Sequence, residues 1–245
     1  NGHSMATLTT GEKLDDKGDP IPGTGFEYES DGAVADLLAL RTSPILYSPP
    51  QGEWVWMIPD ESNGKNERCV AVCPTGNKGP QAHYHPAFDE HFKAITGSWA
   101  LKADAEELSL NAGEDIVVRK GVKHTYRCVG DEGEFGVVEI DIIPAVGFEG
   151  MMRGLMGQQQ EGVVNSRGDM PFLQAMVALR GYRTSLGLSF SEIAIMVPPG
   201  KSVMALLGVL SIFIAPIGRL LGYRADYPHY YEDEFWEKRV NQPLK

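Results

Sequence analysis

The chain has 245 residues, enough for one large domain or for one domain with a substantial extension. Hydrophobic residues make up 42% of it and charged residues 22%, which is ordinary for a folded globular protein. The formal net charge is −11 and no cluster of Lys and Arg interrupts it, so a nucleic acid partner is not expected, because its phosphates would be repelled.

Residues 1–50 form the first of three regions. Asn1 to Met5 resemble what remains after a tag is removed, and the polar stretch that follows lacks the apolar run of a secretion signal. The three cysteines are too few, and odd in number, for a disulfide framework, which indicates reduced thiols. We therefore expect a cytoplasmic protein with an irregular N-terminal arm, in which residues 31–40 form one short helix.

The second region, residues 51–143, is predicted to form a β-barrel or sandwich. Short runs rich in β-branched and aromatic residues alternate with Gly or Pro, as in many short strands joined by turns. The predicted strands are residues 54–58, 68–73, 90–95, 98–103, 115–119, 125–129 and 136–143.

The third region, residues 144–245, is expected to be mostly helical and to pack on the barrel or in a dimer. Helices are predicted at residues 147–160 and 170–183, and residues 190–197 fit either a last strand or a helix. Such an extension could cap the mouth of the barrel, form a dimer or contact a membrane.

Residues 202–218 form an uncharged, apolar run within this region. The run is slightly short for a membrane span, which needs about 20 residues, and it contains Pro216. We expect it to be buried in the fold or in a homodimer interface. Membrane contact is the alternative, which the overall acidity of the chain disfavours.

Four of the six histidines lie between residues 83 and 124. His83 and His85 are two positions apart, so on a strand they share one face. A turn would let Glu90 begin the next strand and face back toward them, and His124 opens a further strand. If the strands close into a barrel, three imidazoles and one carboxylate meet inside it, a donor set suited to Fe, Mn, Co, Ni, Cu or Zn.

The spacing of these residues resembles the first sequence motif of the cupin superfamily. That motif is commonly written G-x5-H-x-H-x3,4-E-x6-G, and His83, His85, Glu90 and Gly97 stand in its register. The chain departs from it at the first glycine position, which is occupied by Asn77, a residue that also tolerates positive φ.

The second cupin motif, G-x5-P-x-G-x2-H-x3-N, is matched further along the chain. Gly113, Gly121 and His124 stand in register, whereas Arg119 replaces the proline and Cys128 replaces the asparagine. All four positions at which cupins place their metal ligands are intact.

This resemblance implies a mainly β fold, a single cupin barrel of the double-stranded β-helix or jelly-roll type, with the α-helical C-terminal extension added to it. It implies that His83, His85, Glu90 and His124 bind one divalent transition metal, with Fe expected first and Mn, Zn, Ni, Co or Cu as alternatives. The motifs occur once, which argues against the seed-storage cupins, since these usually have two such domains.

Strand alternation sorts the neighbouring side chains into those that face the interior and those that do not. His91 should face away because it is adjacent to Glu90, whereas Phe92 should face inward. Tyr126 shares a face with His124 and is a candidate to bind substrate as a catalytic residue. The tryptophans that could also line the pocket, but more commonly pack in a core, are Trp54, Trp56 and Trp99.

The cupin family includes several functions, and three remain open. The first is an Fe(II)-type dioxygenase for a small oxygen-rich organic molecule, polyketide-like compounds included, in which Glu90 is both a ligand and a proton acceptor. The second is a non-redox lyase or isomerase, such as a decarboxylase or cyclase, that stabilises an enolate. The third is a ligand-binding cupin without turnover, which would not need a metal with open positions.

Overall fold

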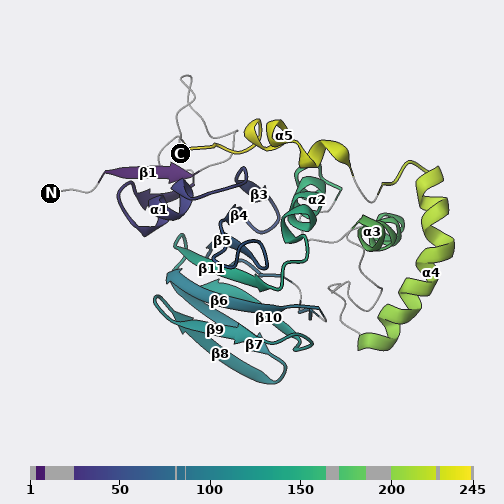
Figure 1. Ribbon diagram of the computed structural model, residues 1–245, viewed down its shortest axis with the longest axis horizontal. Coiled ribbons are helices and arrows are strands. Elements are labelled where there is room, and N and C mark those ends of the chain that lie inside the picture. Colours follow the sequence, from purple (N-terminus) through teal and green to yellow (C-terminus); the bar gives the residue numbers. More distant parts are fainter. Residues whose placement is uncertain are drawn as a thin grey trace.

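The computed structural model describes residues 4–8, 25–80, 82–85, 87–163, 171–185, 200–224 and 227–243. Figure 1 shows a group of strands with helices at its upper edge and a pair of helices, α3 and α4, set apart at one end. Residues 190–197, for which the sequence left strand and helix open, lie outside the described residues.

Two antiparallel sheets form the core of the fold. The strand order is β3-β4-β5-β11-β6-β9 in the six-stranded sheet and β10-β7-β8 in the three-stranded sheet. The strands are β3 (Leu46–Ser48), β4 (Glu53–Ile58), β5 (Glu67–Pro74), β6 (Asp89–Thr96), β7 (Ser98–Ala103), β8 (Glu106–Asn111), β9 (Asp115–Val118), β10 (His124–Val129) and β11 (Phe135–Ile143).

Each strand predicted from residues 54 to 143 is present, within one or two residues of its expected ends. Strand β8 was not predicted, because its sequence EELSLN is mostly polar. It forms as the edge partner of β7, where only Leu110 is fully buried and the exposed side chains remain in water.

The N-terminal region contains more regular structure than the irregular arm predicted from the sequence. Strands β1 (Met5–Leu8) and β2 (Phe26–Glu29) pair with each other, and helix α1 (Ala33–Ala39) lies within the predicted helix. Strand β3 joins the six-stranded sheet beside β4. The three strands were missed because each has only three or four residues and pairs with a partner that the local pattern does not reveal.

Strands β1 and β2 and helix α1, together called the N-terminal layer, cover the outer face of the six-stranded sheet. The indole Nε1 of Trp56 donates to the carbonyl oxygen of Leu37 in α1 at 3.1 Å, and the ring centroids of Phe26 and Phe135 are 5.5 Å apart. Trp54 contacts Phe135 on this same side. Both tryptophans therefore pack beneath the N-terminal layer and do not line the barrel interior.

Strand β5 is covered on both of its faces. This explains why its central residues, Cys69, Val70, Ala71, Val72 and Cys73, include no polar side chain. A strand covered on only one side would alternate apolar and polar residues, whereas one covered on both sides does not. All three cysteines of the chain are buried and unpaired.

The C-terminal region contains α2 (Phe148–Gln160), α3 (Phe172–Ser185), α4 (Gly200–Leu220), a 3-10 turn η2 (Pro228–Tyr231) and α5 (Asp233–Glu237). The N-terminus of α2 is fixed to the barrel by the Glu67 carboxylate, which accepts backbone N–H bonds from all four residues 146–149 at 2.8 to 3.3 Å. A carboxylate in this position satisfies donors that have no partner within the helix. The tail returns to the N-terminal layer, where the Gln242 side chain exchanges two hydrogen bonds with the backbone of Ile45.

The position of α4 overturns the expectation that the apolar run is buried within the fold. Phe213 is 69% exposed and Leu220 87% exposed, and several other large apolar side chains of this helix lie in solvent. Among the described elements, α3 is the one against which α4 packs substantially. No helix in the described part of the chain has the length and apolar character needed to cross a bilayer.

Packing of α2 against η2 can be tested with a pair of glycines on the same helix. A Cβ added at Gly157 would lie 2.4 Å from the ring of the buried Tyr230, whereas one at Gly150 would meet its nearest neighbour, Tyr231, at 3.6 Å. Gly157→Ala should therefore lower the free energy of unfolding by about 1–3 kcal/mol. Gly150→Ala should be neutral or stabilise by up to ~1 kcal/mol, because alanine favours helix. Denaturant unfolding measures both, and equal effects of the two substitutions would contradict this packing.

Candidate metal centre

Two short segments meet in an isolated antiparallel bridge between His83 and His124. The backbone N–H of His83 donates to the carbonyl oxygen of His124 at 2.9 Å, and the reciprocal bond is 2.7 Å long. The N–H of Gly121 donates to the carbonyl oxygen of His85 at 2.7 Å. These bonds place the histidines of the first predicted motif directly beside the histidine of the second.

Glu90 comes from a third segment, strand β6, which lies between β11 and β9 in the larger sheet. Its strand neighbours are Val118 of β9 and Ile142 of β11, so its position is set by pairing on both sides. His91, the next residue, faces outward as predicted. Its Nε2 lies 2.8 Å from Asp115 Oδ2, and its Nδ1 lies 3.3 Å from Asp141 Oδ2.

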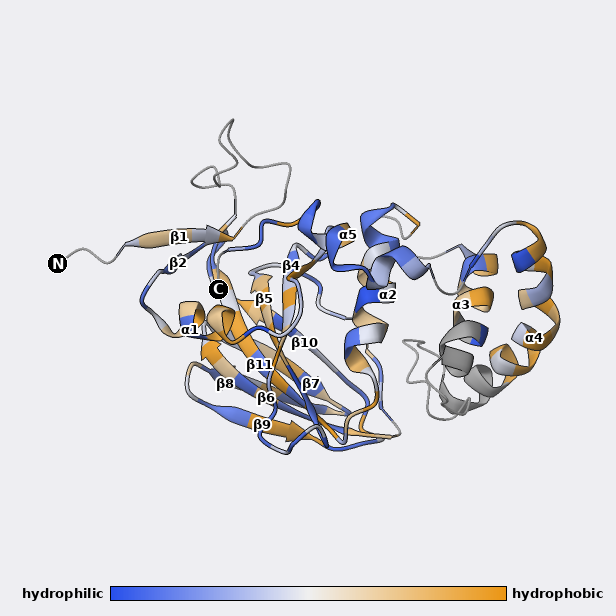
Figure 2. Ribbon diagram, turned by 45° about the horizontal axis from the view of Figure 1, so that its top comes forward, coloured by the Kyte–Doolittle hydropathy of each residue, from blue (hydrophilic) through white to orange (hydrophobic). Residues whose placement is uncertain are grey.

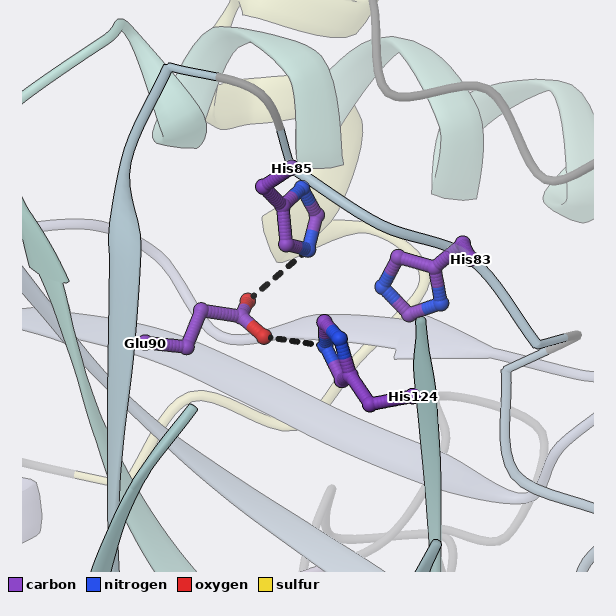
Figure 3. A group of neighbouring side chains, drawn as sticks. All are labelled: His83, His85, Glu90 and His124. Atoms are coloured by element: carbon purple, nitrogen blue, oxygen red, sulfur yellow. Dashed lines mark hydrogen bonds and ion pairs between the residues drawn. The ribbon is translucent and has the colours of Figure 1, made fainter. Parts of the chain in front are cut away.

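The four predicted ligand side chains converge on one point, as Figure 3 shows. One ligand atom from each of His83, His85, Glu90 and His124 lies within 4.8 Å of the others. His124 Nε2 is 2.8 Å from Glu90 Oε2, and His85 Nε2 is 3.4 Å from Glu90 Oε1. Each of the four residues is at most 9% exposed, so the group is almost entirely removed from bulk water.

The two sheets therefore bring both motif segments to one end of an antiparallel barrel, with the motif side chains facing inward. The fold is that of a cupin. The barrel brings the His83–His85 segment, β6 and β10 together at one end, which is why residues up to 41 positions apart in the sequence meet here.

No protein-family model matches this chain, and no curated protein matches it. Among solved structures it is similar to KdgF from Halomonas sp., with 14% identity over 38% of this chain and 81% of that chain, and a TM-score of 0.34. An RmlC-like cupin from Shewanella frigidimarina shows 18% identity over 44% of this chain and 89% of that one, with a TM-score of 0.37. HppE in an Fe(II) form shows 14% identity over 37% of this chain and 50% of that one, with a TM-score of 0.33. Each of these likenesses covers less than half of the chain.

Electrostatics within the group favour an ionised carboxylate. Burial acts to raise the pKa of Glu90, but hydrogen bonds and charge from His124 and His85 outweigh burial and hold that pKa well below its ordinary value. Burial likewise acts to lower the pKa of His124, and the carboxylate of Glu90 outweighs it and raises that pKa. A carboxylate that stays ionised is the form that coordinates a metal ion.

The donor set and its hydrogen bonding fit a divalent ion. His124 Nδ1 is 3.0 Å from the carbonyl oxygen of Val122, a contact that fixes the ring so that Nε2 points to the centre of the group. His85 stacks on Phe88 at 4.1 Å between centroids. Its Nε2 meets the Glu90 carboxylate at 3.4 Å, whereas its buried Nδ1 has no hydrogen-bond partner among the described residues. A buried polar atom without a partner is unfavourable, and coordination to an ion would compensate for it. His83, His85, Glu90 and His124 can therefore hold one divalent metal ion.

Tyr126 lies on the interior face of β10, next to Phe92. Their ring centroids are 5.0 Å apart, and the Phe92 ring is 6.2 Å from that of His124. Burial, followed by the nearby carboxylate of Glu53, holds the pKa of the Tyr126 hydroxyl well above its ordinary value. Tyr126 therefore remains protonated and can donate a hydrogen bond. The ring centroid of Trp99, in β7, is 6.2 Å from that of Tyr126. Trp99 lies on the interior side, in contrast to Trp54 and Trp56 of β4.

Glu53 is an interior carboxyl that sequence reasoning missed. It is the first residue of β4, and its Oε1 lies 3.4 Å from the thiol sulfur of Cys73. Burial raises the pKa of Glu53 to about 7, although the hydrogen bond from Cys73 acts in the opposite direction. The available signal was strand alternation, since Glu53, Val55 and Met57 share a face that turns out to be the interior.

A loss of metal binding on removal of His85 is expected. The polar contact that His85→Ala removes is the 3.4 Å one between its Nε2 and the Glu90 carboxylate, so the fold should survive while the affinity for a divalent ion falls roughly 100-fold or more. His91→Ala is the matched control, because it removes a histidine one residue from Glu90 that faces the other way. Elemental analysis and competition with a chelator measure both proteins. Equal metal content in the two variants would show that the four-residue group is not the binding site.

The raised pKa of Glu53 predicts a pH dependence of stability. The folded protein retains this proton up to about pH 7, whereas the ordinary pKa is 4.5, so stability should fall as the pH rises between these values. Glu53→Gln should reduce that fall by ~1–3 kcal/mol, because each pKa unit corresponds to about 1.4 kcal/mol. Urea unfolding at several pH values measures it, with the exposed Glu106→Gln as control. The assignment would be contradicted if Glu106→Gln reduced the pH dependence of stability, or if Glu53→Gln left it unchanged.

Proposed function

We propose that this chain is a metal-dependent cupin enzyme that acts on a small oxygen-rich organic molecule, and that it is a dioxygenase of the Fe(II) type. The observation that supports this is the convergence of three imidazoles and one carboxylate, from three separate segments, on a single buried point. A set of four protein ligands leaves room for substrate at an ion that prefers higher coordination, which is typical of catalytic sites and not of structural ones.

A bound ion would polarise the oxygen atoms of a substrate and, if it is iron, exchange electrons with dioxygen. The chain's own residues hold this site in place. The His83–His124 bridge fixes two ligands through backbone bonds, and Val122 orients the His124 ring. Glu90 supplies the negative charge, and its carboxylate can accept a proton from a substrate once it moves away from His85 and His124, whose contacts keep its pKa low.

The interior beyond the ligands is apolar with one hydroxyl. Phe92 and Trp99 exclude water from the face of the barrel that Tyr126 shares with His124. The Tyr126 hydroxyl, which stays protonated, is suited to donate a hydrogen bond to a substrate carbonyl or enolate oxygen. These features favour a flat, partly apolar substrate with oxygen atoms at one end, polyketide-like compounds included.

A non-redox lyase or isomerase is the second candidate, and Glu53 is the observation that favours it. A carboxyl with a pKa near 7 can both give and take a proton at neutral pH, and it lies close enough to influence Tyr126. Decarboxylation or cyclisation needs such a proton shuttle and needs no oxidant.

The first experiment is elemental analysis of protein purified without chelators or affinity metals. About one equivalent of iron per chain is expected for the oxygenase, since the described residues contain one four-ligand group. The iron-loaded protein should then consume dioxygen when phenols, enols and β-dicarbonyl compounds are supplied, and Tyr126→Phe should lower the rate roughly 10-fold or more while keeping the iron.

Zinc or nickel in the isolated protein, with turnover but no oxygen uptake, would favour the lyase or isomerase. Binding of metal and of a ligand without any turnover would favour the third alternative, a ligand-binding cupin. Absence of any metal, without rebinding, would exclude the proposed function altogether.

A further inference from the structure

Helix α4 buries its small residues and exposes its large ones. The face toward α3 is made of residues that are buried and have little or no side chain: Gly208, Ser211, Ala215 and Gly218. The large apolar side chains that lie in solvent are Leu206, Val209, Leu210, Ile212, Phe213, Ile217 and Leu220, followed by Leu221. A helix that serves only the core of its own chain has the opposite arrangement.

The exposed side chains, apart from Ile212, form one continuous stripe. Residues three or four positions apart lie on the same face of a helix, and the spacing from Leu206 through Phe213 and Ile217 to Leu220 follows that rule. We call this stripe the apolar face of α4. It runs along the outer edge of the molecule, and Figure 2 shows α4 mainly in the hydrophobic colours there.

The helix is held firmly in this orientation. A Cβ at Gly218 would come within 2.5 Å of Val177 on α3, so the two helices approach closely. The fully buried Gln174 of α3 donates to Gln158 of α2 at 3.1 Å and to the carbonyl oxygen of Arg224 at 2.7 Å. These bonds connect α3, the end of α4 and α2, and through α2 the barrel. The apolar face is therefore a fixed feature of the surface.

Charge is distributed very unevenly between this part of the chain and the remainder. Residues 170–225 contain five basic residues and one acidic residue, a formal charge of +4, which leaves −15 for the remainder of the total of −11. The basic residues are Arg180, Arg183, Lys201, Arg219 and Arg224. Arg219 and Arg224 are both exposed near the end of α4. The net acidity, which disfavours a membrane surface, thus belongs to residues outside 170–225.

We propose that the apolar face of α4 docks on the surface of an anionic lipid bilayer, with the helix lying in the plane of the interface. Large apolar side chains would enter the acyl boundary while the arginines contact lipid phosphates. The acidic barrel would remain outside the short range over which the surface potential acts, about 8 Å at physiological salt. Figure 1 places α4 at the end of the molecule farthest from β1, on the outer side of α3.

A second copy of the chain is the competing occupant, and the charge distribution disfavours it. A symmetric dimer places the same surface on both sides, so the exposed Arg219 and Arg224 of both copies would be brought into one interface without acidic partners on α4. An anionic bilayer is complementary to the apolar stripe and to the positive charge together. This inference does not depend on the proposed chemistry at the metal site.

Co-sedimentation of the full chain with vesicles tests the proposal. Binding is expected to vesicles that contain phosphatidylserine, to be weaker to pure phosphatidylcholine vesicles, and to decrease as salt is raised. Phe213→Asp with Ile217→Asp should abolish binding without unfolding the protein, because both side chains are already mostly exposed. Arg219→Glu with Arg224→Glu should weaken binding by at least roughly 25-fold, at about fivefold for each positive charge removed.

Val117→Asp is the matched control, because Val117 is an exposed apolar residue of β9, away from α4, and its replacement should leave binding unchanged. Sedimentation velocity without lipid completes the test. No binding to anionic vesicles would overturn the proposal whether the protein is a monomer or not. A dimer that Phe213→Asp separates into monomers, with no vesicle binding, would assign the face to a second copy.

Discussion

Burying the Glu90 carboxylate is unfavourable unless other groups compensate for its loss of water, and this constraint organises the barrel. The compensating groups, His85 and His124, come from segments that the sequence separates widely. They reach Glu90 only if the bridge between His83 and His124 forms and if β6 pairs in register with β9 and β11. A slip of one residue in β6 would turn His91 inward and Glu90 outward.

The segments outside the cupin motifs are required by a second constraint, the burial of both faces of the large sheet. Strand β5 has no polar residue between Cys69 and Cys73, so an uncovered outer face would expose a wide apolar surface. The N-terminal strands and α1 cover that surface, and the C-terminal tail is fixed to the same layer through Gln242. Helix α1 and Gln242, from regions near opposite ends of the chain, are therefore part of the folded unit that supports the metal site.

The C-terminal extension has two parts with different physical properties. Helix α2, η2 and α5 pack on the barrel, with Glu67 at the start of α2 and the buried Arg153 bonded to Asp233 and to the backbone of Tyr231. The pair of α3 and α4 projects from this body, carries most of the exposed large apolar side chains and is basic where the body is acidic. The α3–α4 pair thus presents an apolar and basic surface on a chain that is acidic as a whole.

The sequence by itself determined seven strands of the two sheets, helices α1, α2 and α3 and the identity of the clustered residues. Strand alternation specified the inward direction of Glu90 and the outward direction of His91. Motif spacing grouped Glu90 with His83, His85 and His124, although His83 and His85 lie outside the named strands. Alternation does not specify what each side faces. The inward position of Glu53, the outward packing of Trp54 and Trp56, the pairing of the polar strand β8 and the exposure of α4 were decided by tertiary structure alone, because each depends on which distant segment covers a given face.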